Sequence, residues 1–133
     1  MSDSICYLNT DLDLVSATDL TGLAAAMKAR GVSTLHCGLD EDGLWYATFE
    51  VHDRQDRPEA HIGTLLTAVE SLAGEELAAW SHCVSRYFDI GYDCGSEPRA
   101  FSQGLSGQLL GRIAVAGASL RIMLYSPPRD GRI

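Results

Sequence analysis

The sequence predicts an α+β fold, with one mainly antiparallel sheet of about five strands and helices packed on one face. Segments with an apolar residue at every second position alternate with segments whose apolar residues recur every three or four positions. Their order, β-α-β-β-α-α-β-α-β, contains the ferredoxin-like β-α-β-β-α-β arrangement, followed by an added α-β unit. With 133 residues, 46% of them hydrophobic, the chain can bury a core of its own.

The first element, residues 6–15, reads CYLNTDLDLV and is expected to be a strand. Two leucines alternate with two aspartates, Asp11 and Asp13, which indicates one buried and one solvated face. Aspartate is a poor strand former and protects sheet edges, so an edge position is expected.

Residues 16–31 are expected to form a helix that ends at Gly31, a residue suited to the left-handed helix stop. Its apolar residues fall at helical spacing on one face. They are Leu20, Leu23, Ala24 and Met27.

Residues 32–39 and 44–51 are predicted to form a β-hairpin around the turn Asp40-Glu41-Asp42-Gly43, in which Gly43 can adopt positive φ. A helix should follow with Pro58 in its first turn. A break at Gly74 separates it from a shorter helix over residues 75–82.

From Val84 the pattern returns to period two. Phe88 and Ile90 mark the buried face of this strand. The last helix is expected from Ser102, as its N-cap, to Ala116, and a final apolar strand should run from residue 120 to 125. We therefore expect a single α+β domain over residues 1–126 and a flexible C-terminal tail over 127–133.

The net charge of −8 is unevenly distributed. Residues 1–60 carry 11 acidic and 4 basic residues, whereas residues 61–133 carry 7 and 6. The chain lacks a basic run, which argues against nucleic acid as a partner. It also lacks a long apolar segment and a secretory signal, so we expect no membrane partner and a cytoplasmic location with reduced cysteines.

The stretch SHCVSRYFDIGYDCG raises the possibility of a metal or nucleophile site, as does the pair His36-Cys37. Zinc sites use cysteine and histidine pairs at set spacings, and none of the spacings CxxC, HxxxH or HExxH occurs. A nucleophile formed by Cys83 or Cys94 with His82 would need an oxyanion-hole loop, which is not recognisable. Buried, unreactive cysteines are the favoured interpretation, with no metal, no cofactor and no catalytic residue.

The solvent face of the strand after Val84 supplies the candidate binding residues Tyr87, Asp89 and Asp93, with His82 nearby in sequence. The favoured hypothesis is a non-catalytic binding or protein-interaction module, able to form a homodimer or to bind a protein partner. The alternative is a small-ligand-binding protein or enzyme with a pocket near Tyr87, Asp89 and Asp93. A third possibility, drawn from the acidity alone, is an immunity-type partner of a basic protein.

Four stretches carry a resemblance that covers most of the chain: DGLWYATFEV, HIGTLLTAVESL, RYFDIGYDCG and LLGRIAVAGASLRIMLYSPP. They resemble small bacterial proteins grouped as domains of unknown function. The resemblance implies an α+β fold in a bacterial, cytoplasmic protein. It implies no catalytic or binding residues.

Overall fold

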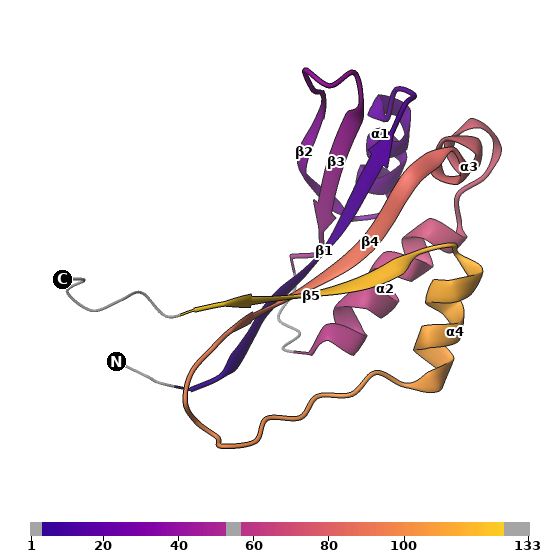
Figure 1. The fold of residues 1–133 in the computed structure, drawn as a ribbon. Coiled ribbons are helices and arrows are strands. Elements are labelled where there is room, and N and C mark those ends of the chain that lie inside the picture. The colour runs from indigo at the N-terminus through magenta and orange to yellow at the C-terminus, as the bar shows by residue number, and fades with distance from the viewer. Residues whose placement is uncertain (1–3, 53–56, 127–133) are drawn as a thin grey trace.

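The computed structural model describes residues 4–52 and 57–126, so the expected tail 127–133 lies outside the described residues. Five strands and four helices follow one another in the predicted order (Figure 1). The strands are β1 (Cys6–Ser16), β2 (Ser33–Leu39), β3 (Trp45–Glu50), β4 (Cys83–Asp93) and β5 (Ser119–Tyr125). The helices are α1 (Thr21–Ala29), α2 (Pro58–Glu70), α3 (Gly74–Ser81) and α4 (Gly107–Val115).

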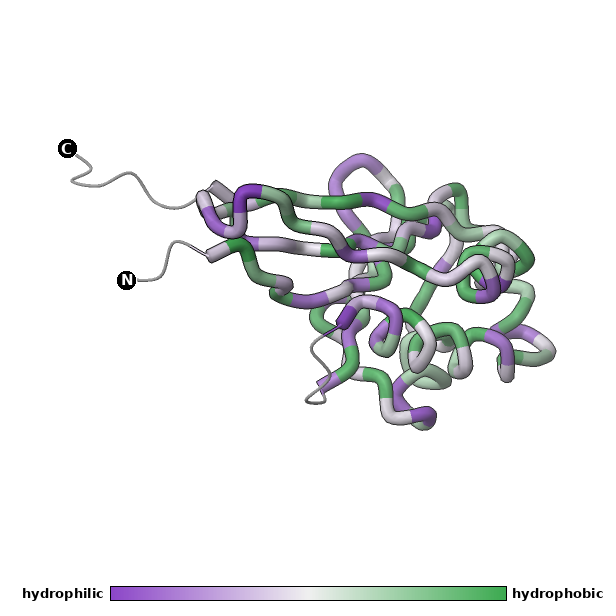
Figure 2. Tube along the Cα trace, turned by 90° about the horizontal axis from the view of Figure 1, so that it is seen from below, coloured by the Kyte–Doolittle hydropathy of each residue, from purple (hydrophilic) through white to green (hydrophobic). Residues whose placement is uncertain are grey.

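The five strands form one sheet in the spatial order β2-β3-β1-β4-β5. Neighbouring strands from β2 to β4 are antiparallel, and β5 is added to β4 in parallel through the α4 connection. The α+β class is confirmed, with a mixed rather than purely antiparallel sheet. Viewed along the sheet, the strands form one layer and the helices lie on one side of it (Figure 2).

The apolar core lies between the inner face of the sheet and α1, α2, α3 and α4. The largest fully buried side chains include Phe49 on β3, Phe88 on β4 and Leu65 on α2. Phe88 and Ile90 are buried as the period-two pattern predicts, at 0% and 3% exposure. Their neighbours along β4 therefore point to the outer, helix-free face of the sheet.

The predicted edge position of the first strand is wrong, because β1 is central and pairs with both β3 and β4. Asp11 and Asp13 are tolerated there because they lie on the outer face of the sheet, where Arg121 of β5 meets Asp13. Alternating aspartates therefore marked the outer face of a central strand and not an edge.

The last helix begins later than predicted. Ser106, and not Ser102, is its N-cap, and the Ser106 side chain accepts a hydrogen bond from the Leu109 N–H at 3.1 Å. Residues 101–106 are not helical and run along the end of the sheet to reach α4 (Figure 1). None of the helices in the described ranges has the length and apolar character needed to cross a bilayer.

Candidate functional site

The outer face of the sheet holds a compact ionic cluster contributed by three adjacent strands. The register places Asp13 of β1 opposite Tyr87 of β4, and Asp89 of β4 beside Arg121 of β5. The same atom, Arg121 Nη2, lies 2.6 Å from Asp13 Oδ2 and 3.2 Å from Asp89 Oδ2. The guanidinium also lies over the Tyr87 ring, 4.9 Å from its centroid.

The cluster is partly withdrawn from solvent. The Asp89 side chain is 15% exposed and the Arg121 side chain 40%. Buried atoms Asp89 Oδ1 and Arg121 Nε have no hydrogen-bond partner among the described residues. Burial raises the pKa of Asp13 above its usual value, even though Arg121 and Thr48 act in the opposite direction. One arginine thus balances two carboxylates incompletely.

Asp11 extends the cluster toward β3. Burial, followed by the charges of Asp13, Glu50 and Asp89, raises the pKa of Asp11 from 3.8 to about 6. The Asn9 side-chain amide donates a hydrogen bond to Asp11 Oδ1 at 3.1 Å. The mutual repulsion of these carboxylates and their burial therefore favour the protonated form of Asp11.

A shallow cavity of about 280 Å³ adjoins this cluster. Tyr87, Asp13 and Arg121 contribute to its lining, together with residues of β1, β3 and β4. These further residues are Leu14, Val15, Tyr46, Ala47, Thr48 and Ser85. Its polar groups come from several strands, so it is a property of the assembled sheet.

The structure brings together two of the four candidate binding residues. Tyr87 and Asp89 share the cluster, although Asp89 does not line the cavity. Asp93 lies at the end of β4, exposed and opposite Cys6. His82 is exposed at the C-cap of α3, so it belongs to neither the cluster nor the cavity.

Sequence reasoning missed Arg121, the residue that organises the cluster. It is the single charged residue in the apolar strand SLRIMLY, and its neighbours on the strand are apolar. That isolation was the available signal, because a lone charge in an apolar strand needs a partner across the sheet. The partner strand itself was not evident before the β4–β5 pairing was known.

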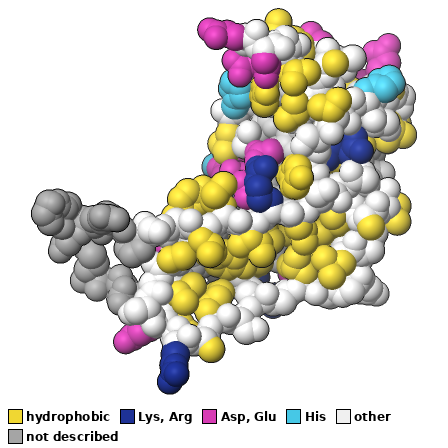
Figure 3. All heavy atoms as spheres, in the orientation of Figure 1, with side chains coloured by type: hydrophobic (Ala, Val, Ile, Leu, Met, Phe, Trp, Pro, Cys, Tyr) yellow, Lys and Arg dark blue, Asp and Glu magenta, His cyan; other side chains and the backbone are white. Residues whose placement is uncertain are grey.

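A second unusual region is the edge formed by β5. Ile122 and Leu124, which point to the inner face, are 63% and 62% exposed. Met123 and Tyr125, on the outer face, are 37% and 50% exposed. Figure 3 shows hydrophobic side chains gathered in a band along β5 and beneath it, with few charges inside the band.

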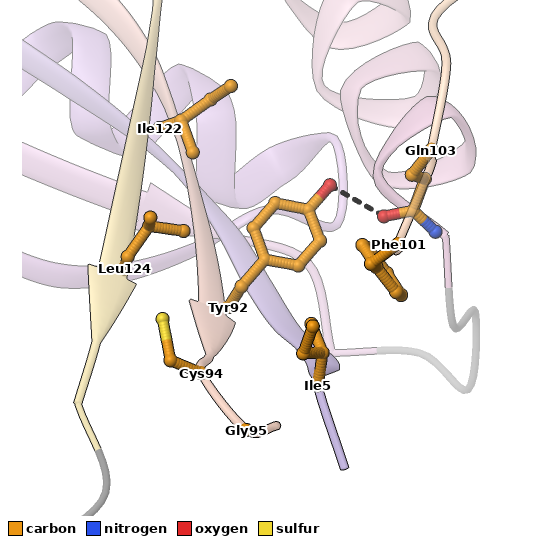
Figure 4. A pocket seen from close by; sticks show the side chains of 8 residues that line it. All are labelled: Ile5, Tyr92, Cys94, Gly95, Phe101, Gln103, Ile122 and Leu124. Atoms are coloured by element: carbon orange, nitrogen blue, oxygen red, sulfur yellow. Dashed lines mark hydrogen bonds between the residues drawn. The ribbon is translucent and has the colours of Figure 1, made fainter. Parts of the chain in front are cut away.

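An apolar groove of about 280 Å³ lies between the end of β5 and the segment that leads to α4 (Figure 4). It is lined by Ile5, Tyr92, Cys94, Gly95, Phe101, Gln103, Ile122 and Leu124. The Tyr92 and Phe101 rings meet edge to face at 5.6 Å, and the Tyr92 hydroxyl donates to Gln103 Oε1 at 2.6 Å. The groove is therefore apolar, and its prominent tyrosine hydroxyl is already bonded.

Cys83, the candidate nucleophile next to His82 in sequence, is packed in the core. Cys83 is buried at 7% exposure, its thiol donates to the Ala79 carbonyl at 3.4 Å, and burial raises its pKa. Within residues 4–52 and 57–126, no three His, Cys, Asp or Glu side chains are grouped so as to hold a metal ion.

Searches against protein-family models, curated proteins and solved structures found no match to this chain. The resemblance to small bacterial proteins stays a prediction.

Proposed function

We propose that this protein is a non-catalytic protein-interaction module that binds an extended segment of protein along the free edge of β5. The observation that carries the proposal is the exposure of large apolar side chains on both faces of this edge strand. Exposed apolar edges are ready templates for strand pairing, and proteins normally protect them.

The backbone of β5 favours this use. The Tyr125 carbonyl accepts a hydrogen bond from the Cys94 N–H of the β4 end at 2.8 Å, so residue 125 directs its backbone groups toward β4. Backbone groups alternate sides along a strand, so those of Leu120, Ile122 and Leu124 point to the open edge. These three residues offer both donors and acceptors to an added strand.

The groove beside β5 provides the side-chain part of such a site. In strand addition, main-chain hydrogen bonds give affinity and pockets for alternate side chains give specificity. Ile122 and Leu124 line the groove on one side and Phe101 on another. An apolar side chain from an added strand could therefore bury itself there while its backbone pairs with β5.

Peptide binding tests this function. The probe is a fluorescent peptide of alternating valine and threonine, titrated against the protein and followed by anisotropy. Binding should weaken at least tenfold in Ile122→Lys, because the ammonium group would occupy the apolar edge. The matched control is Val115→Lys on α4, also apolar and 91% exposed, which should bind normally.

Hydrogen exchange locates the binding. The amides of Ile122 and Leu124 should exchange rapidly in the free monomer and slow down when peptide is bound. Peptide binding without protection at β5, or equal binding by both lysine variants, would move the interaction surface elsewhere.

The second candidate function is small-ligand binding at the outer-face cavity. It is favoured by the convergence of Asp13, Tyr87 and Arg121 on one cavity of about 280 Å³. It ranks lower because the Arg121 guanidinium is already bonded to two carboxylates. A thermal-shift screen of small charged metabolites, repeated with Arg121→Gln, tests it: a hit whose shift is lost in the variant supports the site.

A further inference from the structure

The proposed function does not identify the protein segment that pairs with β5. The sequence of β5 itself indicates which segment is suitable. The strand reads SLRIMLY over Ser119–Tyr125 and is continuous in its pairing with β4, without a bulge. It has no proline and one charge. A strand of this kind can pair with a copy of itself if an antiparallel register exists that opposes suitable side chains.

We propose that a second copy of this chain occupies the β5 edge, through antiparallel β5–β5 pairing about a two-fold axis at Ile122. The inference rests on the proposed function, because it uses the same edge. It joins two sheets into one, with the helices of both copies on the same side. The interface is isologous, as in most protein dimers.

The hydrogen-bonding phase of β5 fits this register. Centring the axis on Ile122 puts Ile122 opposite its own copy and Leu120 opposite the partner's Leu124. These are the residues whose N–H and C=O groups point to the open edge. Each such pair exchanges two bonds, so three pairs give about six hydrogen bonds across the axis.

The side chains fit as well. On the inner face, Leu120, Ile122 and Leu124 of both copies form one apolar row that continues into both grooves. On the outer face, Arg121 lies opposite the partner's Met123, so no like charges meet.

The neighbouring registers are poorer. A shift of two residues in one direction opposes Arg121 to its own copy, which places like charges together. The opposite shift leaves Leu120 beyond the end of the partner's β5. The Ile122-centred register is the one that uses the full strand and avoids repulsion.

The charges on the rest of the molecule do not prevent two copies from associating through β5. The acidic excess belongs to residues 1–60, and the hairpin turn Asp40-Glu41-Asp42 lies at the opposite side of the sheet, between β2 and β3. Arg121 pairs with two of the carboxylates nearest to β5. Repulsion between two chains of net charge −8 is therefore long-range, and salt should weaken it.

Sedimentation velocity across a range of protein concentrations tests the dimer. We expect a reversible monomer–dimer equilibrium that tightens between about 50 mM and about 500 mM salt. Ile122→Lys should weaken dimerisation at least tenfold, and Val115→Lys less than twofold. Circular dichroism checks that both variants are folded, which their exposed positions favour.

Cysteine crosslinking tests the register, in a Cys6→Ser, Cys94→Ser background. Ile122→Cys should form a disulfide-linked dimer under mild oxidation, because opposed Cα atoms lie about 5.5 Å apart, within the range of a disulfide. Ser119→Cys is the matched control, since the two copies of residue 119 would be about 20 Å apart.

The outcomes separate the inference from the function on which it rests. A chain that is monomeric at all concentrations, yet binds the valine–threonine peptide at β5, overturns the dimer and leaves the strand-binding function standing. A monomer that binds no peptide overturns both. A dimer that Ile122→Lys does not weaken, or that Ser119→Cys crosslinks as well as Ile122→Cys, overturns the proposed interface.

Discussion

The two edges of the sheet differ in nearly every respect that controls strand pairing. β2 has a register irregularity between Thr34 and His36, whereas the pairing of β5 with β4 is unbroken. β2 is connected to β3 by a tight turn that contains three acidic residues, whereas β5 is connected to β4 through the longer segment that includes α4. Both edges expose leucines, but those of β5 adjoin an apolar groove.

This difference indicates that apolar exposure alone does not make a strand-binding edge. A bulge twists the edge and interrupts the row of donors and acceptors, and nearby charge opposes a second chain. β2 has both protections, so its exposed Leu35 and Leu39 are compatible with a blocked edge. Within the described residues, the pairing of β5 has no such bulge, and its one charge, Arg121, is already paired with two carboxylates, which is why we place the interaction there.

If β5 is an interaction edge, its exposed residues should contribute little to the stability of the monomer. Phe88→Ala on β4 should lower the free energy of unfolding by about 3–5 kcal/mol, because the ring is fully buried and a cavity remains. Ile122→Ala on β5 should cost about 1 kcal/mol or less, since that side chain is mostly in solvent. Urea unfolding at low protein concentration measures both.

A large loss in Ile122→Ala under these dilute conditions would mean that β5 is held mainly by its own apolar residues. The edge would then be a structural strand, and its exposure would carry no functional meaning.

The second prediction compares two glycines with positive φ, one in the turn before β5 and one in the β2–β3 hairpin. Gly117 precedes β5 at φ +75°, and an added Cβ would lie 3.1 Å from Arg86 Nη2. The Arg86 Nε also donates to the Gly117 carbonyl at 2.9 Å. Gly117→Ala should therefore cost about 2–3 kcal/mol, from left-handed strain and a displaced guanidinium.

Gly43 in the β2–β3 turn has a similar φ of +84°, but an added Cβ would have no neighbouring atom within 4 Å. Gly43→Ala should cost only the strain, about 1–2 kcal/mol. Equal losses in the two variants, measured by thermal or urea unfolding, would show that Arg86 adapts without cost.

Much of this fold was predictable because the apolar spacing changes clearly between elements. The buried pattern of Phe88 and Ile90 identified β4 and its inner face correctly, and Gly43 identified the hairpin. The central position of β1 was not predictable, because aspartates suit both an edge and an outer face. In the structure Asp13 pairs with Arg121, which lies 108 residues further along the chain and is linked to β1 by no local sequence pattern.

The candidate site was half predictable for the same reason. Tyr87 and Asp89 lie on the same face of β4, and the period-two pattern of the sequence predicts this. Which residues of different strands lie close together on that face depends on how the strands pair. Asp93 shares that face yet lies too far along β4, and His82 lies beyond the start of the strand. The exposure of the β5 edge could not be predicted, because an apolar strand is expected to be buried and the order of the strands in the sheet cannot be read from the sequence.

The third prediction concerns the acidic outer face next to β5. Asp11 has its pKa raised to about 6 in the folded protein, so the native state holds a proton that the unfolded chain releases near pH 4. Stability should then fall as pH rises from about 4 to about 6, because the native state binds more protons in that window. Asp13, whose pKa is also raised, acts in the same direction.

Asp11→Asn should remove most of this pH dependence. At about pH 7.5 the variant should be more stable than the natural chain by about 1–2 kcal/mol, a figure reduced for solvent screening because Asp11 is only partly buried. Below about pH 4 the two should be nearly equal, since Asp11 is then mostly neutral in both the folded and the unfolded chain, and at about pH 5 roughly half of the difference should be present. Asp93→Asn, at an exposed site, is the control and should leave the pH profile unchanged.

The smallest expected effect tests the blocked edge. Leu35→Lys on β2 changes an apolar side chain that is 51% exposed, so the free energy of unfolding should change by about 0.5 kcal/mol or less. Dimerisation should change less than twofold, because the bulge at residues 34–36 already interrupts pairing along β2. Sedimentation velocity beside Ile122→Lys makes the comparison direct. If Leu35→Lys dissociated the dimer and Ile122→Lys did not, β2 would be the pairing edge, and the protections we assign to it would be too weak to matter.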